Sequence, residues 1–424
     1  MKLTKIHIHN FKCYDDLHIT HLHPNMNILI GNNGTGKSSL LEALRISIGS
    51  LYLNFDKYDN KISVPGIAPD DIRLSRIGKN LEPSLPCYIL TDAVVDVFDT
   101  ELRGQSPMKS ISWKRAVETK GGKTTHKDAK EMKQLSKDIQ QSVRSGCGYD
   151  IPLIAFFSTN RYKKERRDSE VKTQGSRLQG YFNALDATTN IRFFLDLFYT
   201  ETLDEIQNGN NSEILQTVCE AVKKCINCSS LRYELKQKEL TVGYGNDTPL
   251  PFSMLSDGIR STLALVMELA FRCYLLNPHR GTNAPEVTKG VVLIDEIDLH
   301  LHPSWQTHIL NDLRKAFPCI QFIVTTHAPL IFSQIGDCCI FSLSKRQIYD
   351  FPNQNGRDAN YILQQMDVPY MQQDTQNALD RYIGMIDSGK GKSAEALHLR
   401  SQLEQTLGKD HAELQRADML LTFF

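Results

Sequence analysis

Apolar and polar residues alternate at the start of the chain and then give way to a helical spacing. Residues 3–9 alternate with a period of two, which is typical of a strand with one buried face. Residues 27–30 form a short apolar run that ends at Gly31. The apolar positions of residues 38–48 have the spacing of a buried helix. The opening therefore predicts two strands, a glycine loop and a helix.

The middle of the chain mixes short strands with helices. Residues 51–86 hold several proline and glycine residues, which predict loops between short elements. The strand patterns at residues 87–98 and 110–117 are consistent with an antiparallel lobe. The helical spacing within residues 180–228 predicts a helical insertion. The predicted elements are strands at residues 87–98, 110–117 and 151–158, helices at residues 191–206 and 214–225, and a β-hairpin at residues 231–242.

The last third of the chain predicts a parallel sheet followed by helices. A helix over residues 256–275 precedes a strand at residues 290–294, a helix at residues 304–316 and a strand at residues 320–325. Such a βαβ unit favours parallel pairing under a right-handed crossover. Residues 374–424 carry apolar side chains at helical spacing, which predicts a module of two or three short helices.

Composition and charge indicate a globular chain without a strong overall field. The 424 residues are 41% hydrophobic, and 49 Lys and Arg balance 49 Asp and Glu. Because the formal charge is zero, the molecule as a whole is not drawn to nucleic acid or to an anionic membrane. Two basic segments, residues 109–133 and 161–172, are candidate DNA contacts. For the second half of the first segment, residues 127–143, a solvated helical face is the other interpretation.

Neither secretion nor membrane insertion is expected. Residues 1–10 lack the apolar core of a signal peptide, and the longest apolar stretches fall far short of a membrane span. The ten cysteines are irregularly spaced, which favours reduced thiols and a cytoplasmic location. Cys225 and Cys228 form the one CxxC pair. We predict packed helix residues there, and a zinc site that includes Cys219 is the alternative.

The clearest chemical motif is a glycine-rich loop between an apolar strand and a helix. Residues 31–38 read GNNGTGKS and fit the phosphate-binding pattern GxxxxGK[ST]. Glycines let backbone N–H groups close around phosphate oxygens, and the helix N-terminus adds partial positive charge. Lys37 would reach the β- and γ-phosphates, and Ser38 would hold Mg²⁺. The predicted nucleotide-binding residues are Asn32, Asn33, Gly34, Thr35, Gly36, Lys37, Ser38 and Ser39.

A second motif supplies two carboxylates. Residues 291–296 (VVLIDE) form an apolar strand that ends in Asp295 and Glu296, at the strand end where α/β sheets bind ligands. Asp295 would hold the magnesium ion, and Glu296 would orient and deprotonate the attacking water. An ordinary pair of strand-capping acids is the alternative. His327 follows the next strand, at a position suited to contacting a γ-phosphate.

The start of the helix at residue 256 carries a family resemblance. Residues 255–260 (LSDGIR) fit the LSGGQ-type signature of ATP-binding-cassette (ABC) proteins through Ser256 and Gly258, and depart from it at Asp257 and at Ile259-Arg260. Together with Asn10-Phe11-Lys12 and the DEIDLHLHP segment at residues 295–303, the motifs resemble the non-transporter branch of that superfamily. This branch holds RecF-like, SMC-like and OLD-like ATPases.

The resemblance implies an architecture and a set of ligands. It implies an α/β ABC-ATPase head, with a P-loop parallel sheet and an antiparallel β lobe, a helical insertion and a C-terminal helical module. ATP and Mg²⁺ are the implied cofactors, and the signature would act on the nucleotide of a second copy in a homodimer or a higher oligomer. The expected segments are residues 1–178 and 229–365 for the head, 179–228 for the insertion and 366–424 for the helical module.

Two smaller features are assigned through the same resemblance. The segment Asp70-Asp71-Ile72-Arg73 is the candidate for the Q-loop position. His300 and His302 would belong to the loop at the dimer interface, and a metal pair is the less favoured interpretation. The five histidines from His7 to His23 are expected on solvated strand faces and turns.

The end of the chain directs the functional prediction. No DxD pattern follows His327, so the metal-binding nuclease domain of OLD-family proteins is not expected here. Residues 355–363 (NGRDANYIL) and the helices after them are similar to the ends of PtuA-type ATPases of Septu and retron-associated antiphage systems. That similarity implies an HNH nuclease of PtuB type as a separate partner.

Two functions follow, and they differ in the partner. The leading prediction is a slow ATPase that dimerises around nucleotide and regulates a separate HNH nuclease in antiphage defence. The alternative is a RecF- or SMC-like ATPase of DNA repair or chromosome maintenance, in which the basic segments grip duplex phosphate. DNA or a retron RNA–DNA molecule is a further candidate partner, whereas a transporter subunit or a purely structural role fits the motifs less well.

Overall fold

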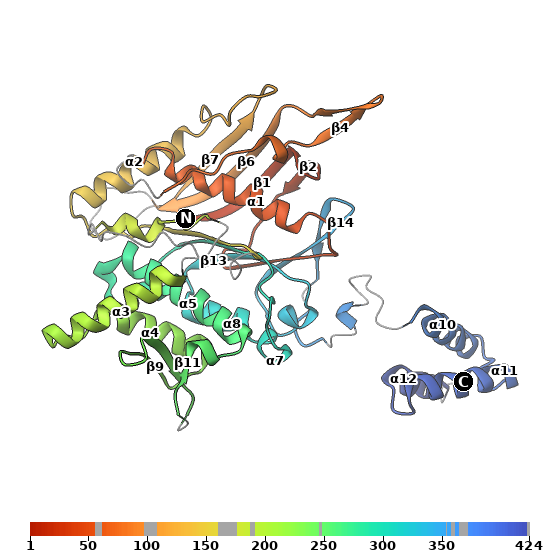
Figure 1. Cartoon of the computed structure of the whole chain (residues 1–424). Coiled ribbons are helices and arrows are strands. Elements are labelled where there is room, and N and C mark those ends of the chain that lie inside the picture. Colours follow the sequence, from red (N-terminus) through yellow and green to blue (C-terminus); the bar gives the residue numbers. More distant parts are fainter. Residues whose placement is uncertain are drawn as a thin grey trace. The chain divides into compact units, whose positions relative to one another are not determined.

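The computed structural model divides the chain into two compact units, Met1–Gly356 and Arg357–Phe424 (Figure 1). The residues that the structure describes are 1–55, 62–96, 108–159, 176–186, 191–245, 248–352, 354–357, 361–363 and 372–421. No helix in these described ranges is both long and apolar enough to cross a membrane.

A six-stranded sheet forms the centre of the first unit, in the order β15-β14-β3-β13-β12-β8. The strands are β3 (Met26–Ile30), β8 (Leu153–Phe157), β12 (Gly290–Ile294), β13 (Ile320–Thr325), β14 (Cys339–Ser344) and β15 (Gln347–Phe351). All neighbours pair in parallel except β14 and β15. Every residue of β3, β8, β12 and β13 is buried, which explains why their sequences are mostly apolar.

A four-stranded antiparallel sheet, in the order β2-β1-β6-β7, lies over one face of the central sheet. Its strands are β1 (Lys2–Phe11), β2 (Tyr14–Ile19), β6 (Cys87–Asp96) and β7 (Met108–Val117). Helix α1 (Lys37–Ile48) contacts both sheets, and α2 (Lys130–Arg144) packs against β7. A small hairpin, β4 (Leu74–Ile77) and β5 (Asn80–Pro83), occupies part of the segment predicted as loops.

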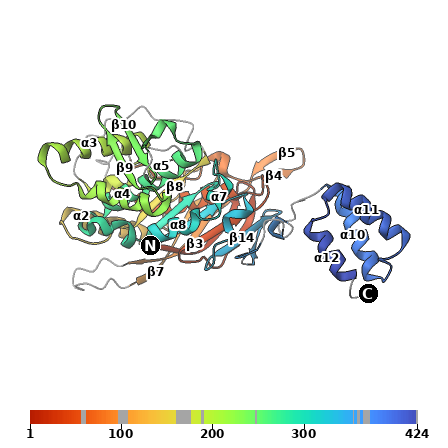
Figure 2. The same ribbon diagram turned by 90° about the horizontal axis from the view of Figure 1, so that it is seen from below.

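Helices and a small sheet cover the other face of the central sheet (Figures 1 and 2). Helix α4 packs on α5 and on α8, and α3 contacts both α4 and α5. The elements are α3 (Ile191–Asn208), α4 (Glu213–Ile226), α5 (Asp257–Leu276), α6 (Ala284–Val287), α7 (Pro303–Gln306) and α8 (Ile309–Ala316), with β9 (Ser230–Glu234), β10 (Glu239–Gly243) and β11 (Leu250–Pro251). Short 3₁₀ turns are η1 (Gly49–Tyr52), η2 (Pro69–Asp71), η4 (Arg177–Tyr181), η5 (Phe252–Met254), η6 (Pro278–Asn283) and η7 (Pro329–Phe332).

One predicted helix is divided in two. The pattern over residues 304–316 predicts a continuous helix, whereas α7 ends at Gln306 and α8 begins at Ile309. The Thr307 hydroxyl donates to the carbonyl of Ser304 at 2.8 Å, and His308 has a φ of −123°. Because the hydroxyl competes with the helical hydrogen bonds of the backbone, the chain turns before α8 starts.

The CxxC cysteines are packed residues near the end of α4. Cys225 and Cys228 are buried, and the Cys225 thiol donates to the carbonyl of Asp312 at 3.4 Å. Burial raises the pKa of the Cys225 and Cys228 thiols, and it raises that of Cys219 to about 11. Both CxxC thiols thus lie in packed surroundings, as the sequence predicted.

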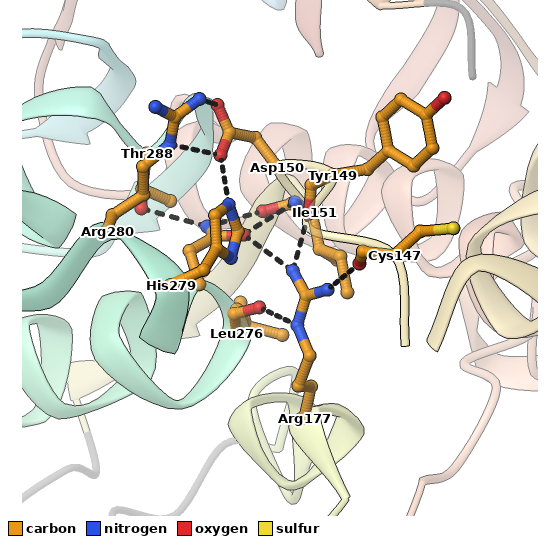
Figure 3. A network of polar contacts seen from close by, with 10 residues as sticks. Cys147, Tyr149, Asp150, Ile151, Arg177, Leu276, His279, Arg280 and Thr288 are labelled. Atoms are coloured by element: carbon orange, nitrogen blue, oxygen red, sulfur yellow. Dashed lines mark hydrogen bonds and ion pairs between the residues drawn. The ribbon is translucent and has the colours of Figure 1, made fainter. Parts of the chain in front are cut away.

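A buried polar network ties the end of α5 to the start of β8 (Figure 3). The Asn277 side chain accepts from the Ile151 N–H at 2.7 Å and donates to the Ile151 carbonyl at 3.0 Å. Arg177 donates to the carbonyls of Leu276 and Cys147 at 2.7 and 2.9 Å. The network therefore fixes the long helix α5 to an edge strand of the central sheet.

The second unit is a three-helix module with its own core. Its helices are α10 (Gln373–Asp387), α11 (Ala394–Leu407) and α12 (Ala412–Leu421). The buried side chains come from all three helices: Leu379, Tyr382, Ile386, Ala396, Leu403, Leu414 and Ala417. The predicted α/β fold, with a parallel sheet, an antiparallel lobe, an inserted helical region and a C-terminal helical module, is confirmed.

Candidate nucleotide-binding site

The carboxyl ends of four parallel strands meet at one edge of the central sheet. Gly31 follows β3, Asp295 follows β12, and Thr326 follows β13, which lies between those two strands. Ser158 follows β8 at the far side of β12. The sheet order therefore brings the glycine loop and the two carboxylates to the same edge, although some 260 residues separate them in the sequence.

The glycine loop needs glycine for two physical reasons. Gly34 and Gly36 have φ values of +79° and +107°, which L side chains rarely adopt. At Gly31 a Cβ would lie 2.5 Å from the carbonyl oxygen of Leu343, so β14 leaves no room for a side chain. Helix α1 begins at Lys37 with no side-chain cap and no acidic residue in its first turn. Its first N–H groups are thus available to an anion.

The β1–β2 hairpin supports the glycine loop from behind. The Tyr14 hydroxyl donates to the carbonyl of Gly36 at 2.9 Å. A Cβ on Gly36 would lie 2.6 Å from that hydroxyl oxygen and 2.7 Å from the Cys13 Sγ. Tyr14 is fully buried. The turn that follows Asn10-Phe11-Lys12 therefore determines how the loop is held.

Lys37 lies folded back along the loop. Its ammonium donates to the carbonyls of Gly31 and Asn32 at 2.8 and 3.1 Å. Burial lowers the pKa of Lys37 from its ordinary value, and the carboxylates of Asp295, Glu296 and Asp298 oppose that shift. The ammonium therefore interacts electrostatically with the acids that follow β12 while it is hydrogen-bonded to the loop carbonyls.

A chain of hydrogen bonds orders the two predicted carboxylate residues. The Thr325 hydroxyl donates to Asp295 Oδ1 at 2.6 Å and accepts from the backbone N–H of Glu296 at 2.7 Å. The backbone N–H of Asp295 donates to the carbonyl of Phe157 at 2.8 Å. Asp295 is 5% exposed, and Glu296 has a φ of +47°. Backbone strain of this kind persists where surrounding contacts hold it, and it clusters at functional sites.

His327 belongs to the same group of charges. Burial lowers its pKa first, and the Lys37 ammonium lowers it further, against the carboxylates of Asp298, Glu296 and Asp295. A neutral imidazole at this position can accept or donate a hydrogen bond without adding charge. The structure thus brings Lys37, Asp295, Glu296 and His327 into one electrostatic environment.

Asp298 is a site residue that the sequence analysis missed. Its Oδ1 is buried and has no hydrogen-bond partner among the described residues, and its charge acts on both Lys37 and His327. A buried carboxylate oxygen without a partner is costly unless a cation or a donor completes the site. The signal in the sequence was its position three residues after Asp295, in the same acidic loop.

The signature residues lie at the start of α5 and face a different loop. Ser256 caps α5, because its hydroxyl accepts from the Ile259 N–H at 3.5 Å. A Cβ on Gly258 would lie 2.5 Å from the carbonyl oxygen of His300. Residues from both segments line an open cleft of about 670 Å³: Ser256, Asp257, Gly258, Ile259, His300, Leu301, His302, Ser304 and Trp305.

The departures from the signature pattern compensate each other. Asp257 and Arg260 form an ion pair on the exposed side of the first turn of α5. The acid that replaces a glycine is thus neutralised by the base that follows three residues later. Among the described residues, no hydrogen bond joins residues 256–260 to the glycine loop of the same chain.

Other predicted positions lie away from this edge or outside the described residues. The Asp70–Arg73 segment packs on the β1–β2 turn: Arg73 pairs with Asp15, and Lys12 with Asp71 at 3.2 Å. His302 caps α7, because its ring nitrogen accepts from the Ser304 N–H at 3.3 Å. This contact gives His302 a structural role that needs no metal ion. The basic segment 161–172 lies outside the described residues.

The first basic segment offers less positive charge than its composition indicates. Arg115 is buried and donates to Ser50 and to the carbonyl of Pro65. Three of its lysines form ion pairs with glutamates: Lys109 with Glu131, Lys114 with Glu118 and Lys120 with Glu82. These contacts lower the positive charge that the segment leaves available to a phosphate backbone.

Comparison with known proteins gives consistent matches. A family model described as an AAA domain, AAA_23, matches residues 5–237. The chain is 25% identical over 397 aligned positions to the Retron Vc95 probable ATPase of Vibrio cholerae serotype O1 biovar El Tor, which covers 79% of this chain and 72% of that protein. It is 25% identical over 487 aligned positions to the Retron Ec83 probable ATPase of Escherichia coli. That alignment covers 98% of this chain and 85% of that protein.

A further match carries the name of another system. The Septu protein PtuA of Bacillus mycoides (strain KBAB4) is 28% identical over 219 positions, which cover 50% of this chain and 28% of that protein. The match to PtuA is therefore partial on both sides, whereas the two retron ATPases match over most of their length.

Proposed function

Because the chain belongs to the AAA_23 family of AAA domains, we propose that it binds ATP with Mg²⁺, hydrolyses it slowly and regulates a separate nuclease in antiphage defence. The chain is an ABC-type ATPase related to retron ATPases and to PtuA. The proposal rests on one observation: the Thr325 hydroxyl links Asp295 to Glu296 by two hydrogen bonds, and Lys37 interacts with both acids.

The described residues fit a nucleotide and its magnesium ion. The first turn of α1 lacks a side-chain cap, and the space around Gly34 is open for 4 Å beyond its Cβ position. The orphaned oxygen of Asp298 adds a buried negative atom at the same place. The loop residues 32–39 would hold the phosphates, and Ser38 and Asp295 would hold Mg²⁺, which prefers hydroxyl, carboxylate and phosphate oxygens.

The site residues divide into binding and reacting groups. Mg²⁺, when bound, neutralises charge on the phosphate oxygens. Lys37 would exchange its two carbonyl acceptors for phosphate oxygens. Glu296 would orient a water molecule and take its proton, and neutral His327 would hold that water or a γ-phosphate oxygen by a hydrogen bond.

The separation of the signature from the glycine loop supports a dimer. Ser256 and Gly258 line the open cleft beside the His300–His302 loop, and no hydrogen bond links them to the loop of their own chain within the described residues. We expect this signature to contact the nucleotide of a second copy, with one nucleotide between each loop and the opposite signature.

The defence role rests on the relatives. The best-covered relatives are named as retron ATPases, and a partial relative is named as a Septu protein. We infer that this chain holds or licenses an HNH nuclease of PtuB type, and that the ATP-dependent dimer controls when the nuclease acts. The second unit, with its own core, is available as a partner-binding module.

The decisive experiment joins nucleotide binding to defence. The chain is expressed together with its flanking genes, and phage plating is compared for wild type, Lys37→Ala and Lys236→Ala, a matched change at an exposed turn lysine. We expect Lys37→Ala to lose ATP binding and protection together, and Lys236→Ala to retain both. Protection that persists in Lys37→Ala after ATP binding is lost would refute the proposal.

A further inference from the structure

Four polar side chains form a block on the exposed face of the β1–β2 hairpin. In the register of the two strands, His7 lies opposite His18, and His9 lies opposite Asp16. Alternate residues of a strand point to the same face, and directly opposed residues have their Cβ atoms about 5 Å apart. The strand pairing itself therefore gathers three imidazoles and one carboxylate.

The side chains converge on the carboxylate of Asp16. His7 Nε2 lies 2.7 Å and His9 Nδ1 lies 3.0 Å from Asp16 Oδ1, while His18 Nε2 lies 2.8 Å from Asp16 Oδ2. The rings of His7 and His18 stack with centroids 3.7 Å apart. Burial raises the pKa of Asp16, but the hydrogen bonds from the three imidazoles together outweigh it and hold that pKa below its ordinary value.

The block is held by packing and is not a set of independent surface residues. Tyr88, which lies opposite His9 on β6, stacks on the His9 ring at 5.1 Å and meets the His7 ring edge-on at 5.2 Å. The Lys114 ammonium lies over the outer side of Tyr88 at 4.8 Å. Strand β1 is paired on both sides, so the ligand positions belong to a continuous sheet.

We propose that His7, His9, Asp16 and His18 bind one Zn²⁺ ion or a divalent transition ion of the same class. Imidazole nitrogen and a single carboxylate are the donors that such ions prefer, whereas Mg²⁺ and Ca²⁺ prefer oxygen donors throughout. One ligand atom each from His7, His9 and Asp16 all lie within 4.8 Å of one another, which supplies three of the four ligands of a tetrahedral ion. His18 Nε2, at 2.8 Å from Asp16 Oδ2, would supply the fourth after a side-chain rotation.

The site is separate from the nucleotide residues but lies on an element that touches them. The same hairpin pairs Phe11 with Tyr14 beyond His9 and Asp16, and the Tyr14 hydroxyl donates to the carbonyl of Gly36. An ion that joins β1 to β2 would hold this turn in place against the glycine loop. The bound ion therefore has a structural role, because it stabilises the pairing of β1 with β2.

The test measures metal binding by the full chain without nucleotide and without a histidine tag. Metal-stripped protein is titrated with Co²⁺, whose visible absorption reports coordination number, and then with Zn²⁺ in competition. We expect one ion per chain, a tetrahedral Co²⁺ spectrum, and displacement of Co²⁺ by Zn²⁺. A wild-type chain that binds neither ion at micromolar concentration would overturn the proposal.

Variants assign the ligands. His18→Gln, which changes a half-exposed side chain, and Asp16→Asn should each weaken Zn²⁺ binding at least about 10-fold, since losing even an outer partner of a metal ligand costs about that much. His7→Gln with His9→Gln should abolish it. His302→Gln is the matched control and should retain full affinity. Unchanged stoichiometry and affinity in the His7→Gln, His9→Gln protein would contradict the site, and so would loss of binding in His302→Gln.

Discussion

The hydroxyl of Thr325 joins Asp295 to the backbone of Glu296, because it donates to the Asp295 carboxylate at 2.6 Å and accepts from the Glu296 N–H at 2.7 Å. One side chain on β13 therefore links the Asp295 carboxylate to the backbone of Glu296, just after the end of β12. The carboxylate that would hold Mg²⁺ and the backbone that carries the water-orienting acid share this one hydroxyl.

Replacing Thr325 with Val should uncouple the two acids at nearly constant volume. We expect a loss of about 1–3 kcal/mol in the free energy of unfolding, because a buried carboxylate oxygen and an N–H lose their partner. ATP turnover should fall more than ATP binding, since the water-orienting acid loses its fixed position. Thr325→Ser keeps the hydroxyl and should restore turnover. Steady-state phosphate release and denaturant unfolding measure the two effects.

Glu296→Gln should separate binding from hydrolysis. The amide retains the shape of the side chain but cannot take a proton, so phosphate release should fall about 100-fold or more while ATP binding persists. A dimer trapped with ATP should then appear in size-exclusion chromatography coupled to light scattering. A variant that turns over ATP at the wild-type rate would show that another group is the base.

Gly258→Ala should weaken the function of the signature cleft. An added Cβ would lie 2.5 Å from the His300 carbonyl oxygen, so one of the two backbones must shift. We expect reduced ATP-dependent dimerisation with little change in ATP binding to the monomer. Gly384→Ala, where a Cβ meets nothing within 4 Å, is the matched control and should behave as wild type.

The buried ion pair in α5 should be sensitive to the loss of one partner. Arg272 donates to Glu268 at 2.6 and 3.0 Å and to the carbonyls of Gly180 and Phe182 at 2.7 and 3.0 Å. Arg272→Met leaves a buried carboxylate unpaired, and we expect a destabilisation of about 3–5 kcal/mol in denaturant unfolding. Replacing both residues, as Glu268→Leu with Arg272→Met, should recover part of that loss.

The low pKa of His327 predicts a direction for the pH dependence. Burial and Lys37 hold the pKa below 6.5, so the unfolded chain takes up a proton at a higher pH than the folded chain does. The contribution of His327 to stability is therefore full above pH 6.5 and is lost as the pH falls from 6.5 to its folded pKa. ATP turnover should stay constant from pH 7 to 8 and fall at acid pH. His327→Gln should remove the part of the unfolding pH profile that belongs to this residue.

The sequence predicted the buried parallel strands well because their apolar runs have no other interpretation. Strands β3, β12 and β13 lie within one residue of the predicted bounds. Strand β2 was missed because Asp15, Asp16 and His18 make its outer face polar. The sequence analysis also assigned no element to the residues of β14 and β15.

Parts of the site depended on pairing that a linear sequence does not display. Thr325 reads as one more residue of an apolar strand, and its role emerges only when β13 lies beside β12. Asp298 acquires its role because the chain turns back after Glu296 toward Lys37. The histidines predicted on solvated faces do lie on a strand face, but the register of β1 and β2 brings three of them to one carboxylate.

The position of β3 in the sheet has a consequence for biosynthesis. Met26 of β3 pairs with Phe322 of β13, and the Leu3 N–H donates to the Gln321 side chain at 2.7 Å. A ribosome must therefore release almost the whole first unit before the glycine loop gains its neighbours, and closing so long a loop is slow. A nascent or truncated chain that stops before β13 lacks a formed phosphate site.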